Sequence, residues 1–136
     1  PWGPAAFAKA QAEDKPVLLS VSAVWCYWCH VMDETSYSDP DVQALLNENY
    51  VTVRVDNDHR PDINSRYNVG GWPTTAFLTG HGGLIGGATY LPPDPPARLD
   101  GRAPPKYRRH VGRQALFRHL ASHGELVGVL IGFESR

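Results

Sequence analysis

Two cysteines, Cys26 and Cys29, have the clearest capacity for chemistry in this sequence. They are the only cysteines among the 136 residues, and two residues separate them. This spacing lets two sulfur atoms interconvert between a dithiol and a disulfide. The thiolate is the nucleophile in disulfide exchange, so the surrounding elements must lower the pKa of one of the two thiols.

The residues on either side of the pair predict a strand followed by a helix. The run Val17–Val24 is apolar or small and rich in β-branched residues, as in a strand covered on both faces. Residues 31–34 are predicted to be helical. A helix N-terminus carries unpaired N–H groups and partial positive charge, which favour a thiolate. We therefore predict that Cys26 is the nucleophile at this N-terminus and that Cys29, one turn on and partly buried, is the resolving thiol.

The rest of the first ninety residues predicts alternating helices and strands. In chain order, the expected elements are a helix over 2–14, the strand 17–24, the helix after the cysteines, a helix from 40 to 50, a strand over 51–55, a turn and short helix over 58–67, and strands over 74–78 and 84–90. Parallel first strands and a hairpin across Gly80-His81-Gly82-Gly83 predict an α/β sandwich.

Two of these helices have distinctive local signals. The first has a modest apolar face predicted from Phe7, Ala8 and Ala12. The third is expected to begin at Asp39 as N-cap and Pro40 as first helical residue.

Composition limits the function classes. The net charge is −1 and 42% of the residues are hydrophobic, which fits one globular domain and gives no electrostatic case for a nucleic acid or a membrane surface as partner. No apolar run approaches the roughly 20 residues that span a bilayer. Cysteine usage does not settle the compartment. A cytoplasmic location is favoured, and a periplasmic or secreted one stays open because the chain begins at Pro1 and a removed leader would leave no trace.

The composition changes at Pro92. Half of the twelve prolines fall between Pro92 and Pro105, and seven of the thirteen basic residues fall between Arg98 and Arg118. We predict a folded domain over 1–93, followed over 94–136 by a Pro/Arg-rich linker and C-terminal segment. A basic amphipathic helix over 111–122 and a strand over 126–133 are the elements expected there.

Several motifs, in order along the chain, carry a resemblance to a known family. Trp25-Cys26-x-x-Cys29 after a buried strand, followed by Val69-Gly70-Gly71-Trp72-Pro73-Thr74 before a hairpin, resembles the thioredoxin fold. The run Cys26-Tyr27-Trp28-Cys29-His30-Val31-Met32 is similar to the Cys-x-Trp-Cys-His-Val-Met core of the spermatogenesis-associated thioredoxin-like proteins and their bacterial relatives. Further matches are Val55-Asp56, Arg60-Pro61-Asp62, Phe77-Leu78-Thr79 and Gly86-Gly87-x-Thr89-Tyr90-x-Pro92.

The resemblance implies a fold and an activity. The fold is α/β, with a central mixed sheet of about four to five strands flanked by helices. The activity is that of a thiol–disulfide oxidoreductase acting on protein disulfides, without cofactor or metal, and with an unidentified redox partner. It also implies that Pro73 is cis, the form that only X-Pro bonds adopt cheaply.

The side chains around the cysteines are candidates for binding the substrate and for tuning the pKa of Cys26. The expected substrate-binding residues are Trp25, Tyr27, Trp28, Trp72 and Pro73, because an apolar rim suits an extended protein substrate. His30 is a candidate for tuning the pKa of Cys26, since an imidazolium nearby would stabilise the thiolate.

Two positions depart from the expected pattern. Thioredoxins have a buried Asp six residues before the first Cys, where this chain has Ser20, so the usual proton relay to Cys29 is absent. A water, His30 or Asp56 could substitute. Many members of the branch have His where this chain has Tyr27.

Three other functions fit parts of the pattern. Cys26-x-x-Cys29-His30 matches c-type haem attachment, although the strand-rich context argues against it. The two thiolates with His30 and a fourth ligand such as His59 could bind zinc. A thioredoxin fold can also persist as a binding or scaffold module without turnover.

Overall fold

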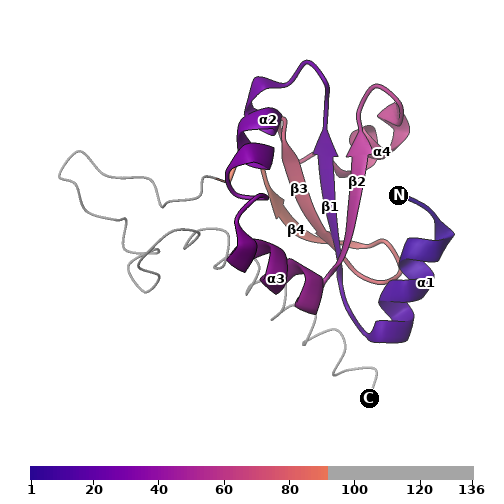
Figure 1. The fold of residues 1–136 in the computed structure, drawn as a ribbon. Coiled ribbons are helices and arrows are strands. Elements are labelled where there is room, and N and C mark those ends of the chain that lie inside the picture. The colour runs from indigo at the N-terminus through magenta and orange to yellow at the C-terminus, as the bar shows by residue number, and fades with distance from the viewer. Residues whose placement is uncertain (92–136) are drawn as a thin grey trace.

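The structure is a computed structural model in which residues 1–91 are described (Figure 1). The predicted domain boundary near residue 93, the linker and C-terminal segment over 94–136, and the elements expected over 111–122 and 126–133 lie outside the described residues.

Within residues 1–91, eight elements follow one another in the predicted order. They are α1 (Pro4–Glu13), β1 (Val17–Ser22), α2 (Tyr27–Glu34), α3 (Pro40–Asn49), β2 (Val51–Asp56), α4 (Pro61–Tyr67), β3 (Thr74–Leu78) and β4 (Leu84–Ala88). The strands form one sheet in the order β2-β1-β3-β4. β1 is parallel to β2 and antiparallel to β3, and β3 is antiparallel to β4. This mixed four-stranded sheet confirms the predicted α/β thioredoxin fold.

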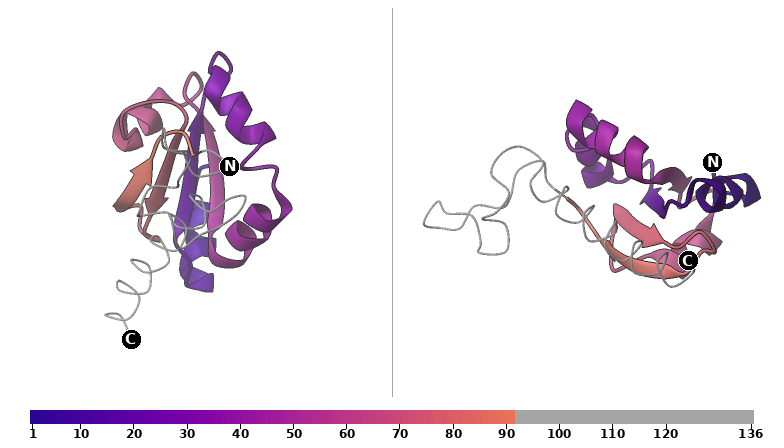
Figure 2. Two further views of the ribbon diagram at one scale, coloured as in Figure 1. Left: turned by 90° about the vertical axis from the view of Figure 1, so that its left-hand side faces the viewer. Right: turned by 90° about the horizontal axis from the view of Figure 1, so that it is seen from below.

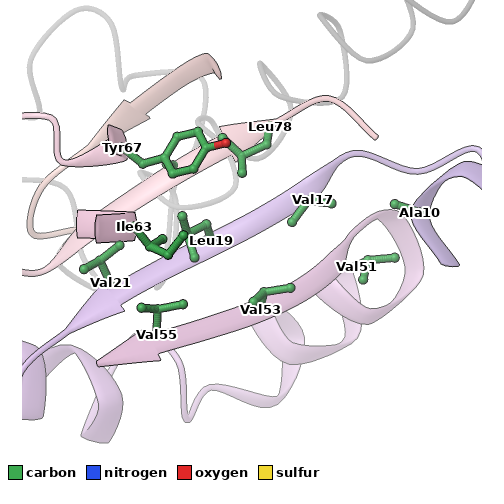
Figure 3. Packing of buried hydrophobic residues seen from close by; sticks show 11 residues of the cluster. Ala10, Val17, Leu19, Val21, Val51, Val53, Val55, Ile63, Tyr67 and Leu78 are labelled. Carbon is green, nitrogen blue, oxygen red and sulfur yellow. The ribbon is translucent and has the colours of Figure 1, made fainter. Parts of the chain in front are cut away.

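The helices cover the two faces of the sheet in pairs (Figures 1 and 2). Residues of α1 and α4 pack with alternate residues of β1 and β2 in one core, which Figure 3 shows. On the other face, Met32 of α2 and Val42 and Leu46 of α3 pack against Leu18 and Phe77. β1 is therefore buried along its whole length, as predicted from its continuous apolar run. At the edge strand β2, burial alternates along the residues, as its sequence predicts.

The start of α3 confirms a sequence prediction. Asp39 is the N-cap, and its Oδ1 accepts hydrogen bonds from the N–H groups of Asp41 at 2.9 Å and Val42 at 3.3 Å. Pro40 is the first helical residue, where its missing N–H costs nothing.

The predicted apolar face of α1 was wrong in part. Ala8 and Ala12 are exposed, whereas Ala10 is buried and Ala6 and Phe7 pack on the core. Phe7 and Ala10 lie three residues apart and Ala6 and Ala10 four, so these residues share one face. Alanine has too small a side chain to mark a face clearly.

Two predicted strands end earlier than expected. β1 stops at Ser22, and Val24 is 75% exposed in the turn that follows, although its side chain continues the β-branched run. β4 stops at Ala88 rather than residue 90. Within residues 1–91, no helix has the length and apolar character needed to cross a bilayer.

Candidate active site

The two cysteines lie at the N-terminus of α2, next to the end of the central strand β1. Cys26 is the N-cap of α2, and a disulfide joins it to Cys29, with 5.3 Å between the two Cα atoms. The Cys29 N–H donates a hydrogen bond to Cys26 Sγ at 3.2 Å. Cys26 is 6% exposed and Cys29 1%. Both residues are thus buried, and Cys26, the less buried of the two, is the one whose sulfur receives a helix N–H. This donor also suits a thiolate at that position.

A tight turn carries the chain from β1 into α2. The Cys26 N–H donates to the carbonyl oxygen of Ala23 at 3.1 Å, so Val24 and Trp25 occupy the two central positions of the turn. Ala23 is buried beside the two cysteines. The turn thus anchors the disulfide on the core side and presents Val24 and Trp25 outward.

Exposed aromatic side chains surround the disulfide. The exposed fractions are 59% for Trp25, 70% for Tyr27, 53% for Trp28 and 37% for Trp72. Trp25 and Trp72 meet edge to face with ring centroids 5.4 Å apart. The Trp28 ring packs against two tyrosine rings, with ring centroids 5.3 Å apart for Tyr27 and 5.0 Å apart for Tyr90. We call these five side chains the aromatic rim. Its three tryptophans are exposed and do not belong to the core.

Two polar side chains hold two of the three rim tryptophans by their indole N–H groups. Trp25 Nε1 donates to Asp58 Oδ1 at 3.2 Å, and Trp72 Nε1 donates to Asn64 Oδ1 at 3.0 Å. Neither acceptor was predicted from the sequence. They follow β2, in segments that no local sequence signal links to the cysteines.

The loop before β3 places Trp72 beside Trp25. The Trp72–Pro73 peptide bond is cis, as the resemblance implies. Asn68 Oδ1 accepts from the N–H groups of Gly70 at 2.8 Å and Gly71 at 3.0 Å, and Asn68 Nδ2 donates to Gly71 O at 3.0 Å. Gly70 has a φ of 125°, a conformation that favours glycine. Pro73 is buried, so Trp72 presents the larger surface of this loop.

The His30 ring contacts the backbone before Cys26. Its Nε2 lies 2.7 Å from the carbonyl oxygen of Val24, and the side chain is on the surface. His30 therefore lies close to the cysteine turn as expected. The contact in the structure is to a peptide oxygen.

Ser20 belongs to a hydroxyl cluster on the α2/α3 face of the sheet. It is buried and pairs with Thr75 of β3, whose Oγ1 lies 2.9 Å from the Tyr37 hydroxyl. Burial raises the pKa of Tyr37 above its ordinary value, while hydrogen bonds with Thr75 and Ser20 act in the opposite direction. Neutral hydroxyl groups thus occupy the position at which a buried Asp is expected from the resemblance to thioredoxins.

The neighbouring charges are paired or fixed in turns. Asp33 of α2 forms a bidentate ion pair with Arg54 of β2, which raises the pKa of the Arg54 guanidinium, and Arg54 also donates to Ser22 Oγ at 3.2 Å. Asp56, considered above as a substitute proton carrier, accepts from the N–H groups of Asp58 at 2.8 Å and His59 at 3.4 Å. These bonds close the turn after β2.

The zinc alternative has no assembled ligand set in the described part of the chain. Residues 1–91 contain no group of three or more His, Cys, Asp or Glu side chains placed to hold a metal ion. His59, the fourth ligand considered, is exposed, and so is His81.

Comparison with known proteins identifies the family. Residues 1–103 match the family described as "Thioredox_DsbH: Protein of unknown function, DUF255". The chain belongs to this family. Among relatives of this Thioredox_DsbH domain, "Spermatogenesis-associated protein 20" of Rattus norvegicus is 43% identical over 102 residues, covering 69% of this chain and 13% of the relative. "Thiol:disulfide interchange protein DsbD" of Yersinia pestis is 33% identical over 79 residues, covering 56% of this chain and 13% of the relative.

A solved structure has the same fold. A thioredoxin from Thermus thermophilus has a TM-score of 0.68 and 25% identity, covering 95% of this Thioredox_DsbH chain and 88% of the thioredoxin. The chain spans 13–14% of the length of the curated relatives it matches. Together with the disulfide-bonded Cys-x-x-Cys pair, these comparisons support a redox role of the thioredoxin type.

Proposed function

We propose that this domain is a thiol–disulfide oxidoreductase that acts on disulfides of protein substrates. One observation carries the proposal: Cys26 and Cys29 form a disulfide at the N-terminus of α2, with Cys26, the less buried of the two residues, at the N-cap. The relatedness to a protein named for thiol:disulfide interchange supports the same activity.

In the reducing direction, the first step joins the substrate to Cys26. The Cys26 thiolate attacks one sulfur of the substrate disulfide, a Cys26–substrate disulfide forms, and the other substrate sulfur leaves as a thiolate and takes up a proton. The helix N-terminus and the Cys29 N–H stabilise the attacking thiolate. Cys29, at 1% exposure, is shielded from direct attack on a protein substrate.

The second step releases the substrate. Cys29 loses its proton and attacks Cys26 Sγ, forming the Cys26–Cys29 disulfide and expelling the second substrate thiol. The substrate gains two electrons and the domain loses two, so a dithiol donor must reduce the domain again. The same steps in reverse oxidise a substrate dithiol.

The aromatic rim is the proposed substrate surface. Its rings flank the cysteines, and the anchored pair Trp25 and Trp72 offers apolar area at a low entropic cost. The backbone N–H and C=O of Trp72 have no hydrogen-bond partner among residues 1–91, so an extended substrate segment can pair with them.

Two cysteine variants test the proposal. Reduction of insulin disulfides with dithiothreitol as donor should be faster with the parent than without protein, and Cys26→Ser should abolish the acceleration. Cys29→Ser should accumulate a mixed disulfide on Cys26 with a disulfide-containing peptide, detected by intact mass. Glu34→Gln, an exposed change on the same helix, is the matched control and should behave as the parent.

The opposite outcomes would favour the binding-module alternative. Its support is the absence of an acid at Ser20. A parent protein without activity, or activity that survives Cys26→Ser, would reject catalysis by this pair.

A further inference from the structure

We infer that His30 is a positioning residue: its ring fixes the turn before Cys26 and thereby holds Trp25 in place for a peptide substrate. The inference rests on the proposed function and assigns to His30 a role through the backbone, in place of the expected role as a cation that tunes the pKa of Cys26.

The hydrogen bond between the His30 ring and Val24 O can have only one donor. A carbonyl oxygen accepts hydrogen bonds and does not donate them, so Nε2 must carry the hydrogen in its 2.7 Å contact with Val24 O. Both the Nε2–H neutral tautomer and the imidazolium have this donor. The contact therefore does not require a positive charge on the ring.

The accepting carbonyl belongs to the central peptide of the turn. Ala23 and Cys26 close the turn by a backbone hydrogen bond of 3.1 Å, and the Val24–Trp25 peptide lies between them. The two commonest turn types differ by a flip of this central peptide, which reverses its carbonyl and N–H. The flipped form would need a positive φ at Trp25, which a non-glycine residue rarely adopts, and Trp25 does not have one. The hydrogen bond from His30 adds to this preference and restrains the remaining rotation of the Val24–Trp25 peptide.

The turn has few other restraints on its outer side. Val24 is 75% exposed, so its side chain contributes little packing. Trp25 is 59% exposed and is held by one hydrogen bond to Asp58 and by the edge of Trp72. The orientation of the Val24–Trp25 peptide sets the direction in which the Trp25 side chain leaves the backbone. His30 thus links the cysteine helix α2 to the Trp25–Trp72 pair.

Two substitutions separate this role from the electrostatic one. His30→Gln keeps an N–H donor at about the reach of Nε2 but cannot be a cation, whereas His30→Leu removes both. A positioning role predicts that His30→Gln resembles the parent, and an electrostatic role predicts that both variants fail alike. His59→Leu is the matched control, because His59 is exposed and its ring has no hydrogen-bond partner among residues 1–91.

The experiment measures second-order rate constants of the reduced proteins with two disulfides. One is a disulfide-linked peptide with aromatic residues beside its cysteines, and the other is 2-hydroxyethyl disulfide, which has no aromatic group or peptide backbone to bind the aromatic rim. We expect His30→Leu to lower the peptide rate relative to the small-disulfide rate by about three- to tenfold, the effect of one lost hydrogen bond. The ratio for His30→Gln should stay within about twofold of the parent.

Three results would overturn the inference. In the first, the ratio of peptide rate to small-disulfide rate is as low for His30→Gln as for His30→Leu. In the second, His30→Leu slows the reactions with both disulfides equally. In the third, neither variant changes the ratio. An equal slowing would indicate a changed thiolate pKa instead of a displaced Trp25.

A spectroscopic measurement separates this inference from the proposed function. Near-ultraviolet circular dichroism of the oxidised proteins reports the Trp25–Trp72 contact without any turnover. His30→Leu should diminish the tryptophan bands and His30→Gln should preserve them. If the parent reduces neither disulfide, the proposed function fails, and the dichroism alone then decides whether His30 orders the turn.

Discussion

Replacing Asn68 by alanine should destabilise the fold through the loop that carries Trp72. The Asn68 side chain makes four hydrogen bonds, with Gly70 N at 2.8 Å, Gly71 N at 3.0 Å, Gly71 O at 3.0 Å and Asn64 Oδ1 at 2.9 Å. Each such bond contributes a net ~0.5–1.5 kcal/mol to stability. Because Asn68 is half-buried and Gly70 is exposed, water can replace some of these hydrogen bonds in the variant. We therefore expect the free energy of unfolding to fall by about 2 kcal/mol.

The assay is denaturant unfolding of the oxidised protein followed by far-ultraviolet circular dichroism. Asn47→Ala is the matched control. Asn47 is exposed on α3 and its side chain has no hydrogen-bond partner among residues 1–91. Alanine has the higher helix propensity, so this variant should be as stable as the parent or gain up to ~0.7 kcal/mol.

The reaction rates of the same Asn68→Ala variant with two disulfides provide a second test. Gly71 precedes Trp72, so loss of the Asn68 bonds should also slow reaction with the aromatic peptide disulfide more than with 2-hydroxyethyl disulfide. A free energy of unfolding within about 0.5 kcal/mol of the parent would show that the loop is held by other contacts and would refute the reasoning.

Three further changes test the packing and the polar cluster. Met32→Ala should cost ~2–5 kcal/mol of unfolding free energy by leaving a cavity, since Met32 is 0% exposed, and a loss below about 1 kcal/mol would contradict this packing. Asp39→Ala should cost ~0.5–2 kcal/mol through loss of the α3 N-cap, whereas Asp39→Asn should retain most of the stability; equal losses would argue against the cap. Burial raises the pKa of Tyr37 above 10.0, so the neutral hydroxyl is favoured in the folded state; stability should be intact below pH 10 and fall as pH rises further. Urea titrations from pH 8 to 11 should show a shallower alkaline decline for Tyr37→Phe, and parallel curves would contradict the assignment.

The order of elements was predictable because it depends on local signals. The continuous apolar run of β1, the alternation in β2 and the Asp39-Pro40 start of α3 each specify one element without long-range information. The position of the cysteine pair at the N-terminus of α2 followed from the strand before it. The face of α1 did not follow, because alanines occur all around that helix and burial of Ala10 depends on where the sheet lies.

The partners of the site could not be predicted because they depend on tertiary contacts. Trp25 and its acceptor Asp58 are 33 positions apart in the sequence, and the contact exists only because β1 and β2 end at the same edge of the sheet. The sequence motifs made Trp25, Trp28 and Trp72 candidates for substrate binding. The polar atoms that orient the indoles of Trp25 and Trp72 lie in the turn after β2 and in α4.

The last described residues, Tyr90 and Leu91, contact α2 and the segment that follows it. Tyr90 packs on Trp28, and the carbonyl oxygen of Leu91 accepts a hydrogen bond from the buried Ser36 hydroxyl at 2.6 Å. Leu91, the last described residue, therefore lies close to the C-terminal end of α2. A cargo fused after this residue would be tethered near the disulfide, and its encounters with Cys26 would depend on tether length and local concentration rather than on the bulk concentration of either partner.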